Sequence, residues 1–177
     1  PTKPGLSDPT GRTLAPPEIY TERVGVIVMI GQSLIANRHE GTYTPASNKN
    51  QNLNPYDGKI YVSQNSILGP SGTISHVGPR VADKLIAAGH LDRVVLVSVA
   101  IGGTSIAEWV SSGQFTHRTL VAALRLADLR LKPNAILIHR GETDALNGMS
   151  QSAYFSYQAA EIFMLKNFWP HAPILIS

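Results

Sequence analysis

The sequence predicts an α/β fold, in which a central parallel sheet carries helices on both faces. Continuous runs of β-branched and aliphatic residues recur at 24–30, 94–100 and 135–138, and such runs are typical of strands buried on both faces. Segments with helical periodicity separate these runs, so strand and helix alternate along the chain. The 177 residues, 43% of them hydrophobic, suffice for one domain with a substantial core.

The first part of the chain divides into an arm and the start of the sheet. Residues 1–17 are rich in Pro, Gly, Thr and Ser, which indicates an extended arm. We place the arm at residues 1–22 and the domain at residues 23–177. The domain opens with the strand at 24–30. A polar, turn-rich stretch at 40–51 predicts a long surface loop, and a short second strand follows at 60–62.

The remaining elements alternate in the same way. Gly78-Pro79 precedes a helix at 80–88, because Pro suits a first helical position, and Gly89 is a helix stop. The strand at 94–100 is followed by a helix whose apolar face is predicted to hold Leu120, Leu124, Ala127 and Leu131. After the strand at 135–138 comes an amphipathic helix with Phe155, Ala159, Ile162 and Phe163, and residues 174–176 begin a last strand.

Composition excludes several classes of function. The formal net charge is only +3 and no run of five basic residues occurs, so we expect no nucleic-acid partner. Cysteine is absent, which excludes disulfides and thiolate metal sites. No stretch approaches the roughly 20 apolar residues of a membrane span. The chain begins with Pro1 and shows no signal peptide; its location stays open, with export slightly favoured.

Three predicted strands end in residues that carry chemistry. The first ends in Gly31-Gln32-Ser33. Gly31 allows a tight turn, and Ser33 then lies at a helix start, where its hydroxyl can attack a carbonyl and nearby N–H groups can hold an oxyanion. The alternative is that Ser33 only caps the helix, and the tripeptide alone favours the cap.

The other two strand ends carry the same kind of signal. The strand at 94–100 is followed by Gly102-Gly103 and a segment that reaches Trp109, and paired glycines let the backbone approach a ligand or simply make a tight turn. The segment 139–144, His-Arg-Gly-Glu-Thr-Asp, groups hydrogen-bonding side chains that alternatively cap a helix. Because ligands bind beyond the carboxyl ends of parallel strands, we expect all three segments to meet at one rim.

These blocks together resemble the SGNH-hydrolase superfamily, and within it the sialate O-acetylesterase and carbohydrate esterase family 6 branch. That branch carries Gly-Gln-Ser-Asn, matched here by residues 31–34. It carries a Gly-Gly-Thr block followed by an apolar residue and Trp, matched by residues 102–109. It also carries Gln-Gly-Glu-Ser-Asp, matched by residues 140–144, and a Gly-Pro before a helix, matched by Gly78-Pro79. The blocks follow in the family's order over nearly the whole chain.

The resemblance implies a flavodoxin-like three-layer α/β/α sandwich, the SGNH-hydrolase fold, and hydrolysis of acyl esters, commonly acetyl groups on sugars. It implies Ser33 as the nucleophile and no cofactor or metal. The implied oxyanion hole consists of the Ser33 N–H, a backbone N–H of the glycine turn, and a side chain at position 140. For the turn we prefer Gly103 over Gly102. Site support is expected from Gln32, Glu142 and Asp144, the two carboxylates holding their loop in charged form beside Arg140.

The chain departs from the family pattern in three places. Leu34 replaces the usual Asn, and Arg140 replaces the usual Gln; a guanidinium can donate to an oxyanion or bind a carboxylate on an acidic substrate. The family's Asp-x-x-His pair is missing. Among the six histidines, His139 is nearest the rim, but a neighbouring guanidinium disfavours a protonated imidazole, and we expect the others in surface or loop positions. We therefore expect a segment beyond Ser177, or a second chain, to supply the base, and residues 1–177 alone to be inactive.

Of two other interpretations, a glycan-binding module stays open and a nucleotide-binding domain is disfavoured. A non-catalytic module that holds a glycan on the same rim is the alternative to an esterase acting on an acylated small molecule or carbohydrate. Trp109, Tyr43 and Tyr56 can stack on sugar rings or pack in the protein. A nucleotide-binding domain is disfavoured because Gly-x-x-x-x-Gly-Lys and Gly-x-Gly-x-x-Gly loops are absent.

Overall fold

The computed structural model describes residues 5–16, 22–110 and 113–177 of the chain. Its strands are β1 (Val24–Gly31), β2 (Asn50–Leu53), β3 (Ile60–Val62), β4 (Arg93–Ser98), β5 (Ala135–His139) and β6 (Ile174–Ile176). Its helices are α1 (Gly78–Ala87), α2 (Thr116–Asp128), α3 (Glu142–Leu146) and α4 (Gln151–Phe168), with single 3₁₀ turns η1 (Ser33–Ile35) and η2 (Ile106–Trp109). The predicted strands and helices are all present, with ends shifted by a few residues.

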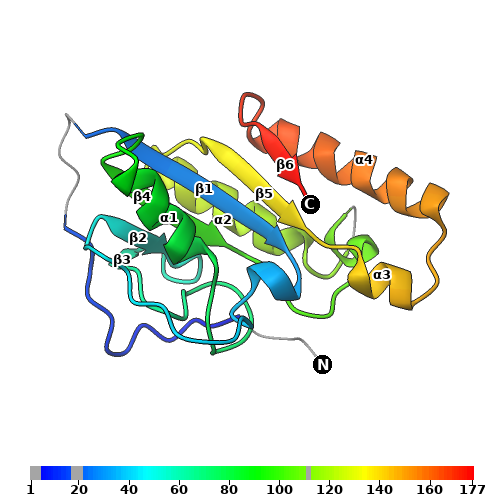
Figure 1. Cartoon of the computed structure of the whole chain (residues 1–177). Coiled ribbons are helices and arrows are strands. Elements are labelled where there is room, and N and C mark those ends of the chain that lie inside the picture. The colour runs from blue at the N-terminus through cyan, green and yellow to red at the C-terminus, as the bar shows by residue number, and fades with distance from the viewer. Residues whose placement is uncertain (1–4, 17–21, 111–112) are drawn as a thin grey trace.

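The strands form one six-stranded sheet in the order β3-β2-β4-β1-β5-β6 (Figure 1). β1 lies in the middle and pairs in parallel with both β4 and β5. β2 and β6 extend the sheet in the same direction, and β3 pairs antiparallel with β2. The carboxyl ends of β4, β1 and β5 are therefore neighbours at one edge of the sheet, as the sequence predicted.

Helices cover both faces of the sheet, which confirms the three-layer fold (Figure 1). On one face, α1 packs Ala82 into a cluster with Ile27, Met29 and Leu96. The opposite face carries α2 and α4, whose residues join the other side of β1, β4 and β5 in a larger cluster. Its fully buried aliphatic members include Val28, Val97, Ile136, Leu126 and Leu165. The alternation of side chains along β1 thus divides the core into two layers.

The strand β2 lies partly within the stretch that the sequence analysis assigned to a loop. Its Asn50-Gln51-Asn52 segment has no apolar pattern, yet all three residues are buried. Asn52 shows why this is tolerated: its amide nitrogen donates to the carbonyls of Leu68 and Leu96, and its side-chain oxygen accepts the Leu68 N–H. Buried polar groups are stable when they are hydrogen-bonded in this way, and hydropathy does not reveal it.

The predicted apolar faces of two helices were wrong at most positions. Leu120, Leu124 and Ala127 of α2 are exposed, and the buried side carries Thr119, Ala122 and Leu126. Leu131, which follows the helix, is partly buried and packs against the core as predicted. In α4 the buried residues are Glu161 and Leu165. The predicted residues Phe155, Ala159 and Phe163 lie at the surface, and Ile162 is half-buried. The buried sides of α2 and α4 therefore carry a less hydrophobic stripe than the periodicity indicated.

The described part of the N-terminal arm lies along the sheet edge. Leu14 forms an antiparallel bridge with Tyr61 of β3, and Leu6 exchanges backbone hydrogen bonds with the 69–70 segment. The rest of the predicted arm, residues 1–4 and 17–21, lies outside the described residues, and the boundary at residue 22 stays a prediction. Among the described helices, none combines the length and the apolar character that crossing a bilayer requires.

The packing of α2 predicts opposite outcomes for two leucines of the same helix. Leu126→Ala removes a side chain that is 0% exposed, and we expect it to lower the free energy of unfolding by about 2–5 kcal/mol through lost burial and a residual cavity. Leu124→Ala changes a side chain that is 55% exposed, and we expect a change within about 0.5 kcal/mol. Urea unfolding of both variants measures this; equal losses would contradict the assigned buried face.

Candidate active site

The candidate site lies at the carboxyl edge of the sheet, where the chain leaves β1, β4 and β5. After β1, Ile35 and Ala36 pack into the core layer of α1. After β4, Trp109 and Phe115 pack into the layer of α2 and α4. The connections therefore diverge to opposite faces beside β1. In open α/β sheets this divergence creates the crevice in which ligands bind.

The turn that carries Ser33 depends on a close approach between β1 and β5. Gly31 has φ +145°, and a Cβ at this position would lie 1.9 Å from the carbonyl oxygen of His139. The next N–H, from Gln32, donates to that same carbonyl at 3.0 Å. Ser33 then begins η1 and is half-buried. Because only glycine fits at position 31, this close approach fixes the direction in which Ser33 leaves the sheet.

The hydroxyl of Ser33 differs in its hydrogen bonding from the nucleophile of a complete hydrolase site. Among the residues that the structure describes, no hydrogen bond is made by Ser33 Oγ, to a histidine or to any other group. Leu34, the departure from the family pattern, is 48% exposed. A free, half-buried hydroxyl at a strand end can reach a ligand, but a serine hydroxyl is a weak nucleophile without a base.

A hydrogen-bonded network joins the end of β1 to the end of β5. The amide of Gln32 donates to Glu142 Oε2, and its oxygen accepts from Thr143 Oγ1 at 2.8 Å. The other oxygen of Glu142 lies 2.9 Å from His139 Nε2, and His139 Nδ1 lies 2.7 Å from Ser177 Oγ. These contacts bring Gln32 and Glu142 together across 110 positions of sequence, as the predicted rim requires.

The Glu142 carboxyl is kept in its ionised form. Partial burial by itself would raise its pKa. Hydrogen bonds from its own backbone, from His139 and from Gln32 outweigh burial, so the pKa of Glu142 is lowered. An ionised Glu142 is a hydrogen-bond acceptor rather than a proton donor near neutral pH.

The turn after β4 is held by backbone and side-chain hydrogen bonds. The Gly102 N–H donates to Ser71 Oγ at 2.8 Å, and a Cβ on Gly102 would lie 2.5 Å from Arg38 Nε. Gly103 is exposed and has φ +68°, a left-handed conformation that favours glycine. At the end of this segment, Trp109 Nε1 donates a hydrogen bond to Thr104 Oγ1 at 3.0 Å. Trp109 is 0% exposed, so it packs in the core and offers no surface to a sugar ring.

Asp144 joins the ends of β5 and β4. Both of its carboxylate oxygens accept the N–H of Ile106, the first residue of η2, at 3.0 and 3.2 Å. The loop-holding contact expected of Asp144 is therefore present. We expected Arg140 to favour its ionised form, but burial dominates and raises the pKa of Asp144, against the opposing effects of the Ile106 hydrogen bond and the Arg140 charge.

Arg140 occupies a place that the sequence did not predict. Its guanidinium lies 2.8 Å from Glu161 of α4, with both side chains 1% exposed, and 4.9 Å from the ring of Trp109. Burial lowers the pKa of Arg140 and raises the pKa of Glu161. The guanidinium is thus enclosed between η2 and α4, where its charge faces Glu161 and the ring of Trp109.

His76 has a structural role that its sequence position did not reveal. We expected it at the surface or in a loop; it lies in the loop before α1 and is 1% exposed. Its Nδ1 accepts the Gly78 N–H at the start of α1, and its Nε2 lies 2.8 Å from the carbonyl of Ile35 in η1. His76 therefore braces the turn that follows Ser33. The Gly78-Pro79 pair, which brings a helix start against this turn, was the available signal.

The described residues contain no group of three His, Cys, Asp or Glu side chains placed to hold a metal ion. What the rim offers is a free serine hydroxyl beside backbone turns, with ionised and amide side chains that fix those turns. This arrangement suits acyl transfer, in which a hydroxyl attacks a carbonyl and N–H groups stabilise the oxyanion.

Known families and structures resemble the chain over most of its length. Residues 24–166 match the family described as "Carbohydrate esterase, sialic acid-specific acetylesterase". No curated protein sequence matches the chain. The crystal structure of a protein from Arabidopsis thaliana shares 16% sequence identity with a TM-score of 0.65, and the match covers 86% of this chain and 73% of that one.

A second similar structure is a carbohydrate acetylesterase from Xanthomonas citri. It shares 14% sequence identity with a TM-score of 0.54. The match covers 86% of this chain but only 40% of that chain. At these identities, both structures support only the three-layer fold. The family match indicates the class of reaction, ester hydrolysis.

Variants of Asp144 can test whether hydrogen bonds hold the rim together. Asp144→Ala leaves the buried Ile106 N–H without its acceptor, and we expect the free energy of unfolding to fall by about 1–3 kcal/mol. Asp144→Asn keeps an oxygen at the same place and should lose less. Urea unfolding compares the two, with Asp128→Ala, at the exposed end of α2, as the control. Equal losses in all three variants would count against the contact.

The lowered pKa of the buried His76 predicts that the stability of the protein depends on pH. Burial lowers its pKa from 6.5 to about 4, so the unfolded chain binds a proton in a range where the folded chain does not. Stability from the neutral imidazole is complete above about pH 6.5 and is lost as the pH falls toward 4, by up to about 3 kcal/mol. His76→Gln lacks this titration. The difference in unfolding free energy between wild type and variant should shrink on acidification; a constant difference would refute the assignment.

Proposed function

Because the chain belongs to the carbohydrate esterase family of sialic acid-specific acetylesterases, we propose that it hydrolyses acetyl esters on carbohydrates with Ser33 as the nucleophile. The observation that carries this proposal is the convergence at Ser33. Gln32, its neighbour, is hydrogen-bonded to Glu142 and Thr143, while Asp144 binds the N–H of Ile106. These contacts link the three strand ends that hold the family's blocks, beside the turn that carries Ser33.

In the proposed reaction, Ser33 Oγ attacks the acyl carbonyl carbon and gives its proton to a general base. The carbonyl oxygen becomes an oxyanion, which the Ser33 N–H and the Gly103 N–H stabilise as donors. The sugar hydroxyl leaves with the proton returned by the base, and an acyl-serine remains. Water then attacks the acyl-serine in the same way, which releases acetate and restores the Ser33 hydroxyl.

Backbone N–H groups carry the proposed oxyanion hole without a side chain at position 140. We assign no oxyanion role to Arg140, because its guanidinium is buried against Glu161. In this proposal Gln32, Glu142 and Asp144 do not contact the reacting atoms. They hold the turns from which the N–H groups project. Their contacts are formed inside the folded chain, so they cost no reorganisation when substrate arrives.

We place the general base in an Asp-x-x-His pair beyond Ser177. The support is the absence of a histidine partner at Ser33 Oγ among the described residues. His139 is the internal competitor, because its pairing with Glu142 and Ser177 has the form of a histidine oriented by a carboxylate. The guanidinium of Arg140, the next residue along the chain, is paired with Glu161.

The test is hydrolysis of an aryl acetate by residues 1–177, alone and extended by the segment that follows in the gene product. We expect turnover only with the extended chain. Ser33→Ala in the extended chain should reduce kcat by a factor on the order of 10⁴ or more, because the nucleophile is lost. His139→Ala should retain activity within about tenfold, as expected for a residue outside the reacting atoms.

Each alternative has its own outcome in this experiment. Turnover by residues 1–177 that is lost in both Ser33→Ala and His139→Ala would make His139 the base. A folded extended chain without turnover on aryl acetate or an acetylated sugar, but with saturable binding of that sugar, would instead identify a glycan-binding module. That second function is favoured by one observation: among the described residues, Ser33 Oγ has no hydrogen-bond partner.

A further inference from the structure

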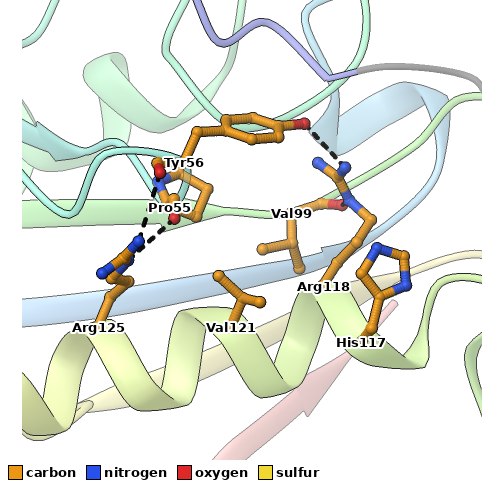
Figure 2. Close-up of a pocket in the computed structure, with 7 residues that line it drawn as sticks. All are labelled: Pro55, Tyr56, Val99, His117, Arg118, Val121 and Arg125. Atoms are coloured by element: carbon orange, nitrogen blue, oxygen red, sulfur yellow. Dashed lines mark hydrogen bonds between the residues drawn. The ribbon is translucent and has the colours of Figure 1, made fainter.

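A pocket separate from Ser33 lies between α2 and the segment that follows β2. Its volume is about 340 Å³, and its lining includes Tyr56, Val99 and four residues of α2, one of which is His117 (Figure 2). The pocket is on the face of the sheet covered by α2, whereas η1, which begins with Ser33, packs on the α1 face. Pockets for small molecules in proteins measure about 300–1,000 Å³, and this pocket lies near the lower end of that range. A ligand with a single ring suits this volume.

The sequence of α2 places two arginines at opposite ends of the pocket. Arg118, Val121 and Arg125 are spaced three and four residues apart, so they share one face of the helix. Seven residues of helix separate the two arginines by roughly 10 Å along its axis. Figure 2 shows Val121 between them, with the ring of Tyr56 on the opposite side of the pocket.

The walls of the pocket are fixed before any ligand arrives. Arg118 donates from Nε to the Val99 carbonyl at 3.1 Å, from Nη1 to Tyr56 Oη at 2.8 Å, and from Nη2 to the Gly69 carbonyl at 2.6 Å. Tyr56 Oη also accepts the N–H of Gly5 at 3.1 Å. The aromatic ring is therefore held in place from two sides, which reduces the entropy lost on binding.

The two guanidinium groups leave the pocket with uncompensated positive charge. Within the described chain, neither Arg118 nor Arg125 forms an ion pair with a carboxylate. Their protein acceptors are carbonyl or hydroxyl oxygens, and the Arg118 guanidinium also lies 5.5 Å from the centre of the Tyr56 ring. Arg125 is the less engaged of the two. It donates to the carbonyls of Pro55 and Tyr56 at 3.2 and 3.4 Å, which leaves other N–H donors of its five uncommitted.

We propose that this pocket is a second binding site, and that it takes a flat aromatic carboxylate. The ring lies between Tyr56 on one side and Val99 and Val121 on the other, and the carboxylate accepts hydrogen bonds from Arg125. A guanidinium binds a planar carboxylate with two parallel N–H donors, and the apolar walls exclude water from the ring. The site is independent of the proposed esterase chemistry, because it shares no residue with the rim around Ser33.

The test compares benzoate with benzyl alcohol, its uncharged analogue of similar shape, by calorimetry and by amide chemical-shift changes on the whole chain. We expect benzoate to bind at least about tenfold more tightly, since charged hydrogen bonds are the stronger ones. Shifts should centre on α2 and the segment after β2. Arg125→Gln should weaken benzoate about tenfold and leave benzyl alcohol unchanged. Lys132→Gln, which removes an equal charge from an exposed position outside the pocket lining, should leave both unchanged.

A second variant keeps the test decisive if Arg125→Gln unfolds. Val121→Glu places a carboxylate between the two arginines on the same helix face, where it pairs with them and competes with the ligand. We expect this variant to fold and to lose benzoate binding. The proposal is overturned if wild type shows no saturable binding of benzoate, or if benzyl alcohol binds equally well. Inorganic phosphate binding as tightly as benzoate would also overturn it, because the aromatic walls would then contribute nothing.

Discussion

The contact between Gly31 and the carbonyl of His139 is the constraint on which the candidate site depends. It brings the end of β1 against the end of β5, closer than any side chain at position 31 allows. Two further consequences follow. The Gln32 N–H meets the same carbonyl, and the Gln32 amide reaches Glu142 and Thr143. Ser33 is then the first residue free of this contact, so its hydroxyl leaves the sheet at a position set by backbone geometry rather than by its own hydrogen bonds.

Around this contact, polar groups rather than apolar ones join the loops. Asp144 holds the turn after β4 through the Ile106 N–H, and His76 holds the turn after Ser33 through the Ile35 carbonyl. Each is nearly or fully buried, where a satisfied hydrogen bond is stable and an unsatisfied one is expensive. The rim is therefore specified by a few directional contacts, while the two apolar core layers beneath it supply most of the stability.

The buried pair of Arg140 and Glu161 changes the interpretation of a family position. A charged pair that is 1% exposed is held by mutual attraction against a large loss of hydration. Its effect is to attach α4 to the loop after β5 and to set the ring of Trp109 against the guanidinium. The residue that replaces the family's Gln thus takes part in the packing of the domain.

Sequence alone determined the α/β class, the order of the strands that carry apolar runs, and the three blocks at their carboxyl ends. It did so because burial on both faces requires continuous apolar runs, and because parallel strands bring their ends to one edge. The tertiary structure alone decided the rest. The polar strand β2 is stable through side-chain hydrogen bonds to distant loops. The buried faces of α2 and α4 follow the fit of Ala122 and the Arg140–Glu161 pair, not helix periodicity. Contacts such as Asp144 with Ile106 join residues 38 positions apart, and only the folded chain defines their geometry.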